Sequence, residues 1–219
     1  LGTGLLAGRH VVITAGPTRE PICPVRYISN RSSGKMGYAL AEACVNAGAK
    51  TTLISGPVNC SAVDGVHVIA VETTQEMHEA SLLAAATADI FIGAAAVVDF
   101  KPESVASQKI KRNGVAEMDL RLVPNPDIIA TVSNSASRPS LVVGFAAETE
   151  DVKEYARQKL AKKSLDYIFA NDVSDASIGF DSDRNAGVLI GQNGNIEMPI
   201  STKRVLAEAI IGELSRHLD

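Results

Sequence analysis

Two hydrophobic periods alternate along the chain. Short β-branched or continuously apolar runs predict buried strands at residues 10–15, 51–55, 66–71, 89–96, 141–146 and 167–170. Between them, apolar residues return at helical spacing, as at Met36, Leu40, Cys44 and Ala47, and Gly48 follows as a stop. Strands that alternate with helices in this way predict an α/β fold, with a doubly wound, mostly parallel sheet and helices on both of its faces.

Three further helices carry signals at their ends. Thr73 and Glu76 have the spacing of a capping box, which predicts a helix that continues through Met77, Ala80 and Ala84. Pro126 suits the first turn of a helix over residues 125–133. Acids at the start and lysines at the end predict another helix over residues 151–163.

The C-terminal part predicts a small β-hairpin followed by a last helix. Residues 187–190 and 196–200 are the expected strands, with a turn near Asn193 and Gly194. Ser201 is expected to cap the helix, which bears apolar residues on one face.

The composition supports one large domain. Of 219 residues, 46% are apolar, only 4% are aromatic and none is Trp, so the core must consist mainly of Ala, Val, Ile and Leu. No boundary divides the chain, and we expect one domain over residues 10–219. Residues 1–9 look like the remnant of a linker, and a chain without an initiating Met looks like half of a longer polypeptide.

Charge and cysteine content exclude several classes of function. The net charge of -4 argues against nucleic acid as the partner, because binding a phosphate backbone requires a basic face. No segment has the length of a membrane span or resembles a signal peptide. Cys23, Cys44 and Cys60 show no C-x-x-C spacing, which indicates a reducing compartment. We therefore expect a cytoplasmic protein without a membrane partner.

Polar loops follow the predicted strands, at the edge where open α/β sheets bind ligands. Residues 16–33 and 97–122 show neither hydrophobic period, and we expect irregular loops there. Ser32, Ser33 and Gly34 precede a helix whose backbone N–H groups would favour a phosphate. Ser is also an ordinary N-cap residue, and the spacing supports both interpretations equally.

A basic cluster of Lys109, Lys111 and Arg112 lies in the second of these loops. Such clusters are usually solvated. The position after a buried strand instead favours a clamp on a triphosphate, where positive charge would stabilise a pyrophosphate leaving group. Asp99, at the end of that strand, can bind ribose hydroxyls or a metal, or it can be a turn residue.

Tyr155 and Lys159 match the Tyr-x-x-x-Lys pattern of short-chain dehydrogenases. However, the Gly-rich cofactor turn of those enzymes is missing after the first strand. Tyr155 also shares an apolar stripe with Val152 and Ala156, so we expect its ring in the core. Spacing alone leaves Lys159 and Lys163 as solvated lysines, although both lie on one helix face and can reach the same anion.

Several runs together resemble one enzyme family. The chain contains, in order, ITAGPTREPICPVRYISNRSSGKMGYALAEA, GAAAVVDF, KIKR, NPDII, VGFAAET, RQKLAKKSLDYIFANDVS and GFDSDRN. These runs cover nearly the whole chain and resemble the phosphopantothenoylcysteine synthetases, in particular the bacterial branch that uses CTP. The resemblance implies a Rossmann-like fold. It also implies a CTP-dependent ligase that joins 4′-phosphopantothenate to L-cysteine in coenzyme A biosynthesis.

The implied reaction has two steps. The carboxylate of phosphopantothenate attacks the α-phosphate of CTP, which releases pyrophosphate and leaves an acyl-cytidylate. The amino group of cysteine then attacks the acyl carbon and expels CMP.

The family pattern implies roles for individual residues. Asn30 would stabilise the acyl-cytidylate and its tetrahedral successor, and Lys109 would assist the first step. The family's K-x-K-K pattern reads KIKR here, so Lys111 and Arg112 are further basic-loop candidates. The implied CTP site comprises Ser32, Ser33, Gly34, Gly93, Ala94, Ala95, Asp99, Lys109, Asn125, Pro126, Asp127, Ile128, Phe145, Lys159 and Lys163.

The resemblance also implies Mg²⁺, held mainly by the CTP phosphates, and no flavin in this half. In most bacteria such a domain follows a flavin-dependent decarboxylase in one polypeptide. Family members dimerise, and the hairpin near residues 190–200 or the loop near Asp181 would contribute to a homodimer. Two alternatives have their own signatures: a dehydrogenase needs a dinucleotide fingerprint, and a nucleotide sensor would bind CTP without turnover.

Overall fold

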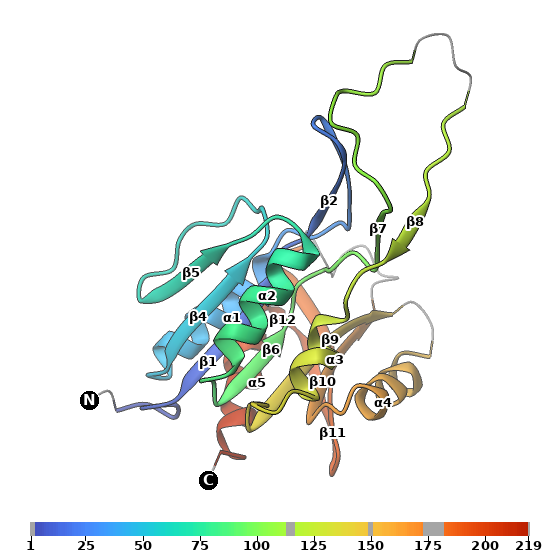
Figure 1. Ribbon diagram of the computed structural model, residues 1–219. Helices are drawn as coiled ribbons and strands as arrows, with labels where there is room; N and C mark the ends of the chain where they lie inside the picture. Colours follow the sequence, from blue (N-terminus) through green and yellow to red (C-terminus); the bar gives the residue numbers. More distant parts are fainter. Residues whose placement is uncertain (1–2, 113–116, 149–150, 173–181, 219) are drawn as a thin grey trace.

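An eight-stranded sheet forms the centre of the computed structural model, which describes residues 3–112, 117–148, 151–172 and 182–218 (Figure 1). The strand order is β12-β11-β10-β9-β6-β1-β4-β5. The six strands from β10 to β5 run parallel, and the antiparallel β11 and β12 extend one side. The strands are β1 (His10–Ala15), β4 (Lys50–Ser55), β5 (Val66–Ala70), β6 (Ile90–Gly93), β9 (Leu141–Glu148), β10 (Tyr167–Asp172), β11 (Arg184–Gly191) and β12 (Gly194–Thr202). The predicted doubly wound sheet and C-terminal hairpin are thus confirmed.

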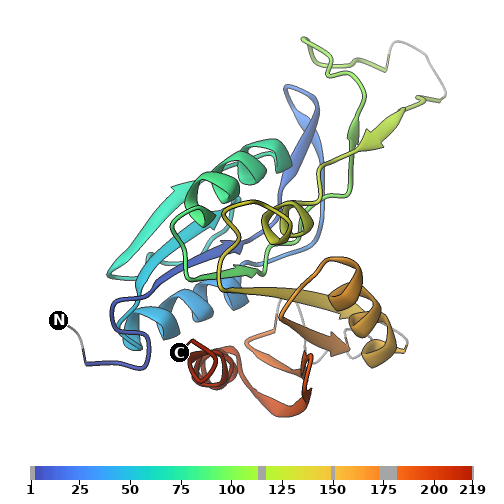
Figure 2. The ribbon, with the colours of Figure 1, turned by 60° about the horizontal axis from the view of Figure 1, so that its bottom comes forward.

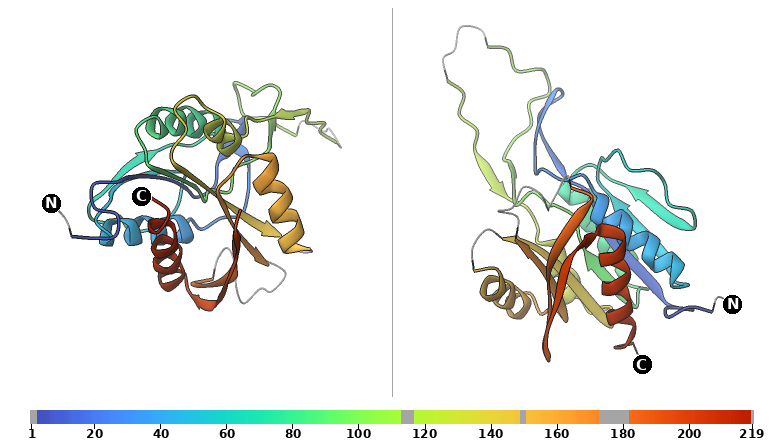
Figure 3. Two further views of the ribbon diagram at one scale, coloured as in Figure 1. Left: turned by 90° about the horizontal axis from the view of Figure 1, so that it is seen from below. Right: turned by 180° about the vertical axis from the view of Figure 1, so that it is seen from behind.

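Helices cover both faces of this sheet (Figures 2 and 3). One face carries α1 (Lys35–Asn46) and α5 (Lys203–Ser215). The other carries α2 (Thr74–Ala85), α3 (Ile128–Ser133) and α4 (Val152–Lys162). Successive residues of β1 point to opposite faces, so each strand contributes to two separate cores. No helix in the described part of the chain is long and apolar enough to cross a bilayer.

Helix caps differ from the sequence prediction at two positions. The capping box of α2 is confirmed, since the Thr73 hydroxyl accepts from the N–H of Glu76. The N-cap of α5 is Thr202 and not Ser201, because β12 continues through residue 202. Helix α3 begins at Ile128 rather than in the Asn125–Pro126 turn, because Asp127 caps it through the N–H of Ala130.

Two hairpins lie in the segments that were expected to be irregular loops. Strands β2 (Arg19–Cys23) and β3 (Arg26–Ser29) form the first hairpin. Strands β7 (Phe100–Pro102) and β8 (Leu122–Pro124) form the base of the second. Residues 100–112 and 117–124, here called the projecting arm, extend away from the sheet (Figure 1). The two hairpins touch, since the N–H of Ala106 donates to the carbonyl of Ile22 at 3.0 Å.

The first and last described segments meet at the amino ends of the parallel strands. Leu6 is fully buried, and its N–H donates to the carbonyl of Ala47, so part of the expected linker packs on the domain. Arg9 forms an ion pair with Asp89 at 3.2 Å and also donates to the carbonyl of Leu218. This guanidinium therefore ties the two ends of the described chain to β6 on the side away from the carboxyl edge.

Candidate functional site

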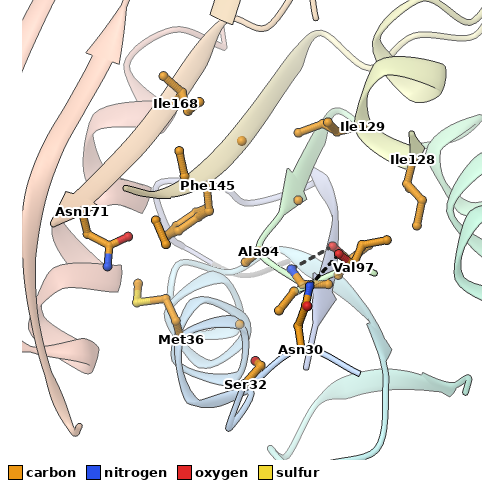
Figure 4. A pocket seen from close by; sticks show the side chains of 18 of the residues that line it. Asn30, Ser32, Met36, Ala94, Val97, Ile128, Ile129, Phe145, Ile168 and Asn171 are labelled. Atoms are coloured by element: carbon orange, nitrogen blue, oxygen red, sulfur yellow. Dashed lines mark hydrogen bonds between the residues drawn. The ribbon is translucent and has the colours of Figure 1, made fainter. Parts of the chain in front are cut away.

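A cavity of about 380 Å³ opens at the carboxyl edge of the sheet, between β1 and β6 (Figure 4). The strand order reverses at this point, which is where doubly wound sheets bind ligands. The cavity is lined by the residues around the start of α1, the loops after β6 and β9, the residues before and within α3, and the side chains of α4, β10 and β11.

Most of the predicted CTP-site residues meet in this cavity. Those that line it are Asn30, Ser32, Ser33, Gly34, Gly93, Ala94, Ala95, Asp99, Pro126, Asp127, Ile128, Phe145, Lys159 and Lys163. Asn125 lies nearby but is not among the described lining residues, because its amide donates to the carbonyl of Val98. Lys109, Lys111 and Arg112 are exposed on the projecting arm and are also outside this lining.

The lining also includes polar residues that the sequence analysis did not single out. Asn171 and Asn185 are buried on one side of the cavity, and the Asn171 amide donates to the Asn185 oxygen at 3.4 Å. Both lie in runs already noted for the family resemblance, ANDVS and DRN, so the signal for them was present. Lys203, which is 6% exposed, belonged to no such run.

The amino end of α1 is shaped to bind an anion. Its N-cap is Gly34 in the left-handed conformation (φ 77°), a residue without a side chain that could cap the helix. A Cβ at position 34 would lie 2.7 Å from the Cγ1 of Val58, so only glycine fits. The hydroxyl of Ser32 accepts from the N–H of Gly34 at 3.3 Å. The backbone N–H groups of the first turn therefore favour a phosphate at this point.

Asn30 is held against the loop that follows β6. Its Nδ2 donates to the carbonyl of Val97 at 2.9 Å (Figure 4). The preceding residue is fixed too, since the Ser29 hydroxyl donates to the carbonyl of Thr18 at 2.8 Å. These contacts fix the plane of the Asn30 carboxamide at the cavity.

The opposite wall combines cations with apolar side chains. Lys163 forms an ion pair with Asp127 at 2.9 Å, which joins the end of α4 to the N-cap of α3. The ring of Phe145 packs against Phe169 with centroids 5.2 Å apart and faces the cavity beside Ile168 (Figure 4). A ring and two lysines can together hold a planar base or an anionic group.

Lys35, which lines the cavity next to Gly34, pairs with Asp183 at 2.6 Å. The hydrogen bond from this ammonium holds the pKa of the Asp183 carboxyl below its usual range. Cys60 lies nearby and donates to the carbonyl of Ser33, and burial raises the pKa of its thiol. This ion pair holds the Lys35 ammonium in place beside the first turn of α1.

Tyr155 does not occupy the position that the sequence predicted. Its side chain is 48% exposed instead of packed in the core, because Ala156 and the partly buried Val152 and Leu160 form the inner face of α4. Tyr155 is not among the described residues that line the cavity, whereas Lys159 is. The two residues therefore do not form a dehydrogenase pair at this site.

Sequence comparison assigns the family. The profile of the DNA/pantothenate metabolism flavoprotein C-terminal domain matches residues 6–218. The chain belongs to this family. The resemblance drawn from the motifs is thereby confirmed.

Curated relatives resemble this protein over nearly its whole chain. The Coenzyme A biosynthesis bifunctional protein CoaBC of Vibrio parahaemolyticus is 49% identical over 211 residues, which cover 96% of this chain and 53% of the relative. CoaBC of Escherichia coli strain K12 is 46% identical over 212 residues, or 96% and 52% of the two chains. The chain thus spans about half the length of the curated relatives it matches.

A solved structure of the family has the same fold. The crystal structure of the C-terminal domain of CoaBC superposes with a TM-score of 0.84 at 37% identity. The match covers 99% of this chain and 98% of that one.

Proposed function

We propose that this domain is a CTP-dependent phosphopantothenate–cysteine ligase of coenzyme A biosynthesis. The observation that carries the proposal is the cavity at the strand-order reversal, where Asn30, the start of α1 and the two lysines of α4 converge. Membership of a family that includes the CoaBC C-terminal domain supports the same reaction. The reaction proceeds through an acyl-cytidylate and yields phosphopantothenoylcysteine, CMP and pyrophosphate.

The cavity offers a distinct chemical environment for each part of CTP. The backbone N–H groups in the first turn of α1 favour the phosphates. Asp99, exposed at the cavity mouth, suits ribose hydroxyls, and Phe145 with Lys159 and Lys163 suits the base. The α-phosphorus would then lie near Asn30, whose amide N–H can stabilise the charge that develops during acyl transfer.

Magnesium is expected to bind together with the triphosphate. Within the described residues, no three His, Cys, Asp or Glu side chains gather into a metal cage. Of the two carboxylates in the cavity, Asp127 already binds Lys163 and the N–H of Ala130. Mg²⁺ would therefore be held mainly by the CTP phosphates and by water, as Mg²⁺ prefers. The bound metal would neutralise charge on the departing pyrophosphate.

Lys109 is proposed to assist the first step, although it lies on the projecting arm. The carbonyl of its neighbour Ile110 accepts from Arg26 at 3.0 Å, so hairpin β2–β3 holds this part of the arm. Lys111 and Arg112 would add positive charge beside it. Lys109→Ala should slow the release of pyrophosphate, and an unchanged rate would remove Lys109 from the mechanism.

The reaction is tested by the dependence of each product on each substrate. Pyrophosphate should appear only with CTP, Mg²⁺ and phosphopantothenate together, and CMP only after cysteine is added. A folded sample that binds CTP without releasing pyrophosphate would instead be a nucleotide sensor. Hydride transfer in the absence of CTP would indicate a dehydrogenase.

Asn30→Asp separates the two steps. This change replaces an N–H donor with a negative charge, so it should slow conversion of the acyl-cytidylate more than it weakens CTP binding. Single-turnover measurements of pyrophosphate and CMP would resolve the steps. An unchanged overall rate would show that Asn30 takes no part.

The same proposal includes the location of the protein, its oligomeric state and the domain to which it is fused. We expect a cytoplasmic homodimer, fused in the full-length protein to a flavin-dependent decarboxylase. Of the two interface candidates, the loop near Asp181 lies outside the described residues, while hairpin β11–β12 exposes Ile196 and Ile200. Sedimentation of the isolated domain tests the dimer.

A further inference from the structure

Three polar side chains form a buried network behind the cavity. Thr18 and Thr74 are fully buried, and Asn125 is half-buried. The two hydroxyls are 2.9 Å apart, and the Asn125 amide donates to Thr74 at 3.3 Å. Glu20, 3% exposed, completes the group by accepting from the N–H of Thr74 at 2.8 Å. The network thus joins the start of hairpin β2–β3, the first residue of α2 and the residue that follows β8.

The network binds the loop that follows β6. The N–H of Val98 donates to the Thr18 hydroxyl at 2.9 Å. The carbonyl of Val98 accepts from the Asn125 amide at 2.8 Å, and the N–H of Asn125 donates to the carbonyl of Asp99 at 2.8 Å. Two consecutive residues of this loop are therefore fixed from the side away from the cavity.

On its other side the same loop holds Asn30. The carbonyl of Val97, next to the fixed Val98, accepts from Nδ2 of Asn30 at 2.9 Å. Thr18 contacts this region a second time, because its carbonyl accepts from the hydroxyl of Ser29. The Asn30 carboxamide thus depends on the network through Val97 and Val98, while the backbone of Thr18 holds the preceding residue, Ser29.

We propose that Thr18, Thr74 and Asn125 are positioning residues that orient Asn30 for acyl transfer. The inference rests on the proposed function, in which Asn30 touches the reacting group. The residue types fit this role closely. Nδ2 of Asn125 must donate to two acceptors, which an aspartate in its place could not do. Valine would fill the volume of either threonine, so packing alone does not require the hydroxyls.

The first test compares isosteric variants. Thr74→Val, Thr18→Val and Asn125→Asp should each lower kcat on the order of 10–100-fold, because a shift of about 1 Å in a reacting group has an effect of that size. The KM for CTP should change much less than kcat in the two threonine variants, since Thr18 and Thr74 are not among the described cavity-lining residues. Thr74→Ser keeps the hydroxyl and should restore most of kcat.

Thr52→Val is the matched control. Thr52 is also buried, and its hydroxyl meets Nε2 of His10 at 3.0 Å near the amino ends of the strands. Its loss should lower the melting temperature without changing kcat. Equal losses of kcat in Thr52→Val and Thr74→Val would overturn the positioning role. If Thr74→Val does not fold, Asn125→Asp provides the same comparison, because Asn125 is a half-buried loop residue.

A double-mutant cycle with Asn30→Ala separates positioning from general stability. If Thr74 acts through Asn30, the double variant should be no slower than Asn30→Ala alone. Full additivity of the two losses would refute the inference. An active Thr74→Val beside an inactive Asn30→Ala would also refute it, and would leave the proposed function intact. A fully active Asn30→Ala would overturn both.

Discussion

Gly37→Ala tests whether the close packing of α1 on β1 sets the position of the proposed phosphate site. A Cβ added at Gly37 would lie 2.5 Å from the Cβ of Ala15 and 3.1 Å from its Cα. Carbon atoms in contact are normally about 3.5–4.0 Å apart, so α1 would have to move by roughly 1 Å. Because Gly37 is in the first turn of α1, this shift would carry the N–H groups of that turn away from the cavity.

The expected effect on stability is a small net loss. Overpacking typically costs about 1–3 kcal/mol, and replacing a helical glycine by alanine returns about 0.5–1 kcal/mol. A net loss of about 1 kcal/mol would lower the melting temperature of a domain of this size by about 2–4 °C. The effect on turnover should be larger, on the order of 100-fold, because the phosphates would be displaced from the reacting carboxylate.

Gly212→Ala is the control for helix propensity. Gly212 lies inside α5, and a Cβ there would meet no atom within 4 Å. This variant should gain about 0.5–1 kcal/mol and keep full activity. Pyrophosphate release at varied CTP, together with thermal melts of both variants, measures the contrast. Wild-type kcat and KM in Gly37→Ala would refute the argument that the packing of α1 positions the site.

Two further predictions concern charges near the sheet. Lys163→Met should weaken CTP binding measured by calorimetry, while costing at most about 1 kcal/mol of stability, because its ion pair with Asp127 is partly exposed. The adjacent Lys162→Met, exposed and outside the described lining, should bind CTP normally, and equal weakening in both would contradict the assignment. Glu76→Gln should lower the melting temperature at neutral pH, because N–H groups of the capping box hold the pKa of the Glu76 carboxyl below its usual range. The stability that comes from a lowered pKa is lost as pH falls through that pKa. The melting temperatures of the wild type and Glu76→Gln should therefore become equal in acid. A difference in melting temperature that does not change with pH would exclude the capping explanation.

The sequence was sufficient to predict the sheet and most of the cavity. The central parallel strands carry buried apolar residues on both faces, and the chain order of the loops determines which of them meet. Local patterns could not predict features that depend on distant residues. The amide of Asn125 donates to Thr74, fifty-one positions earlier, and Asn125 is not among the described residues that line the cavity. Thr202 rather than Ser201 is the N-cap of α5, because pairing with β11 extends β12 to residue 202.

The short hairpins escaped prediction for a different reason. Strand β2 contains Pro21, and β7 has only three residues and ends in Pro102, so neither shows an alternating pattern of useful length. The conformation of the projecting arm depends on contacts with the first hairpin, such as the one between Arg26 and Ile110. Lys109 was therefore predicted from its motif, while its location on the arm was not.

The clasp formed by Arg9, Asp89 and Leu218 determines how other proteins or tags can be attached to the domain. The first and last described segments, residues 3–9 and 216–218, lie on the side opposite the projecting arm (Figure 1). An affinity tag or a surface linker joined at either end would thus leave the mouth of the cavity unobstructed. Immobilised through either terminus, the domain should capture CTP from solution as readily as when it is free.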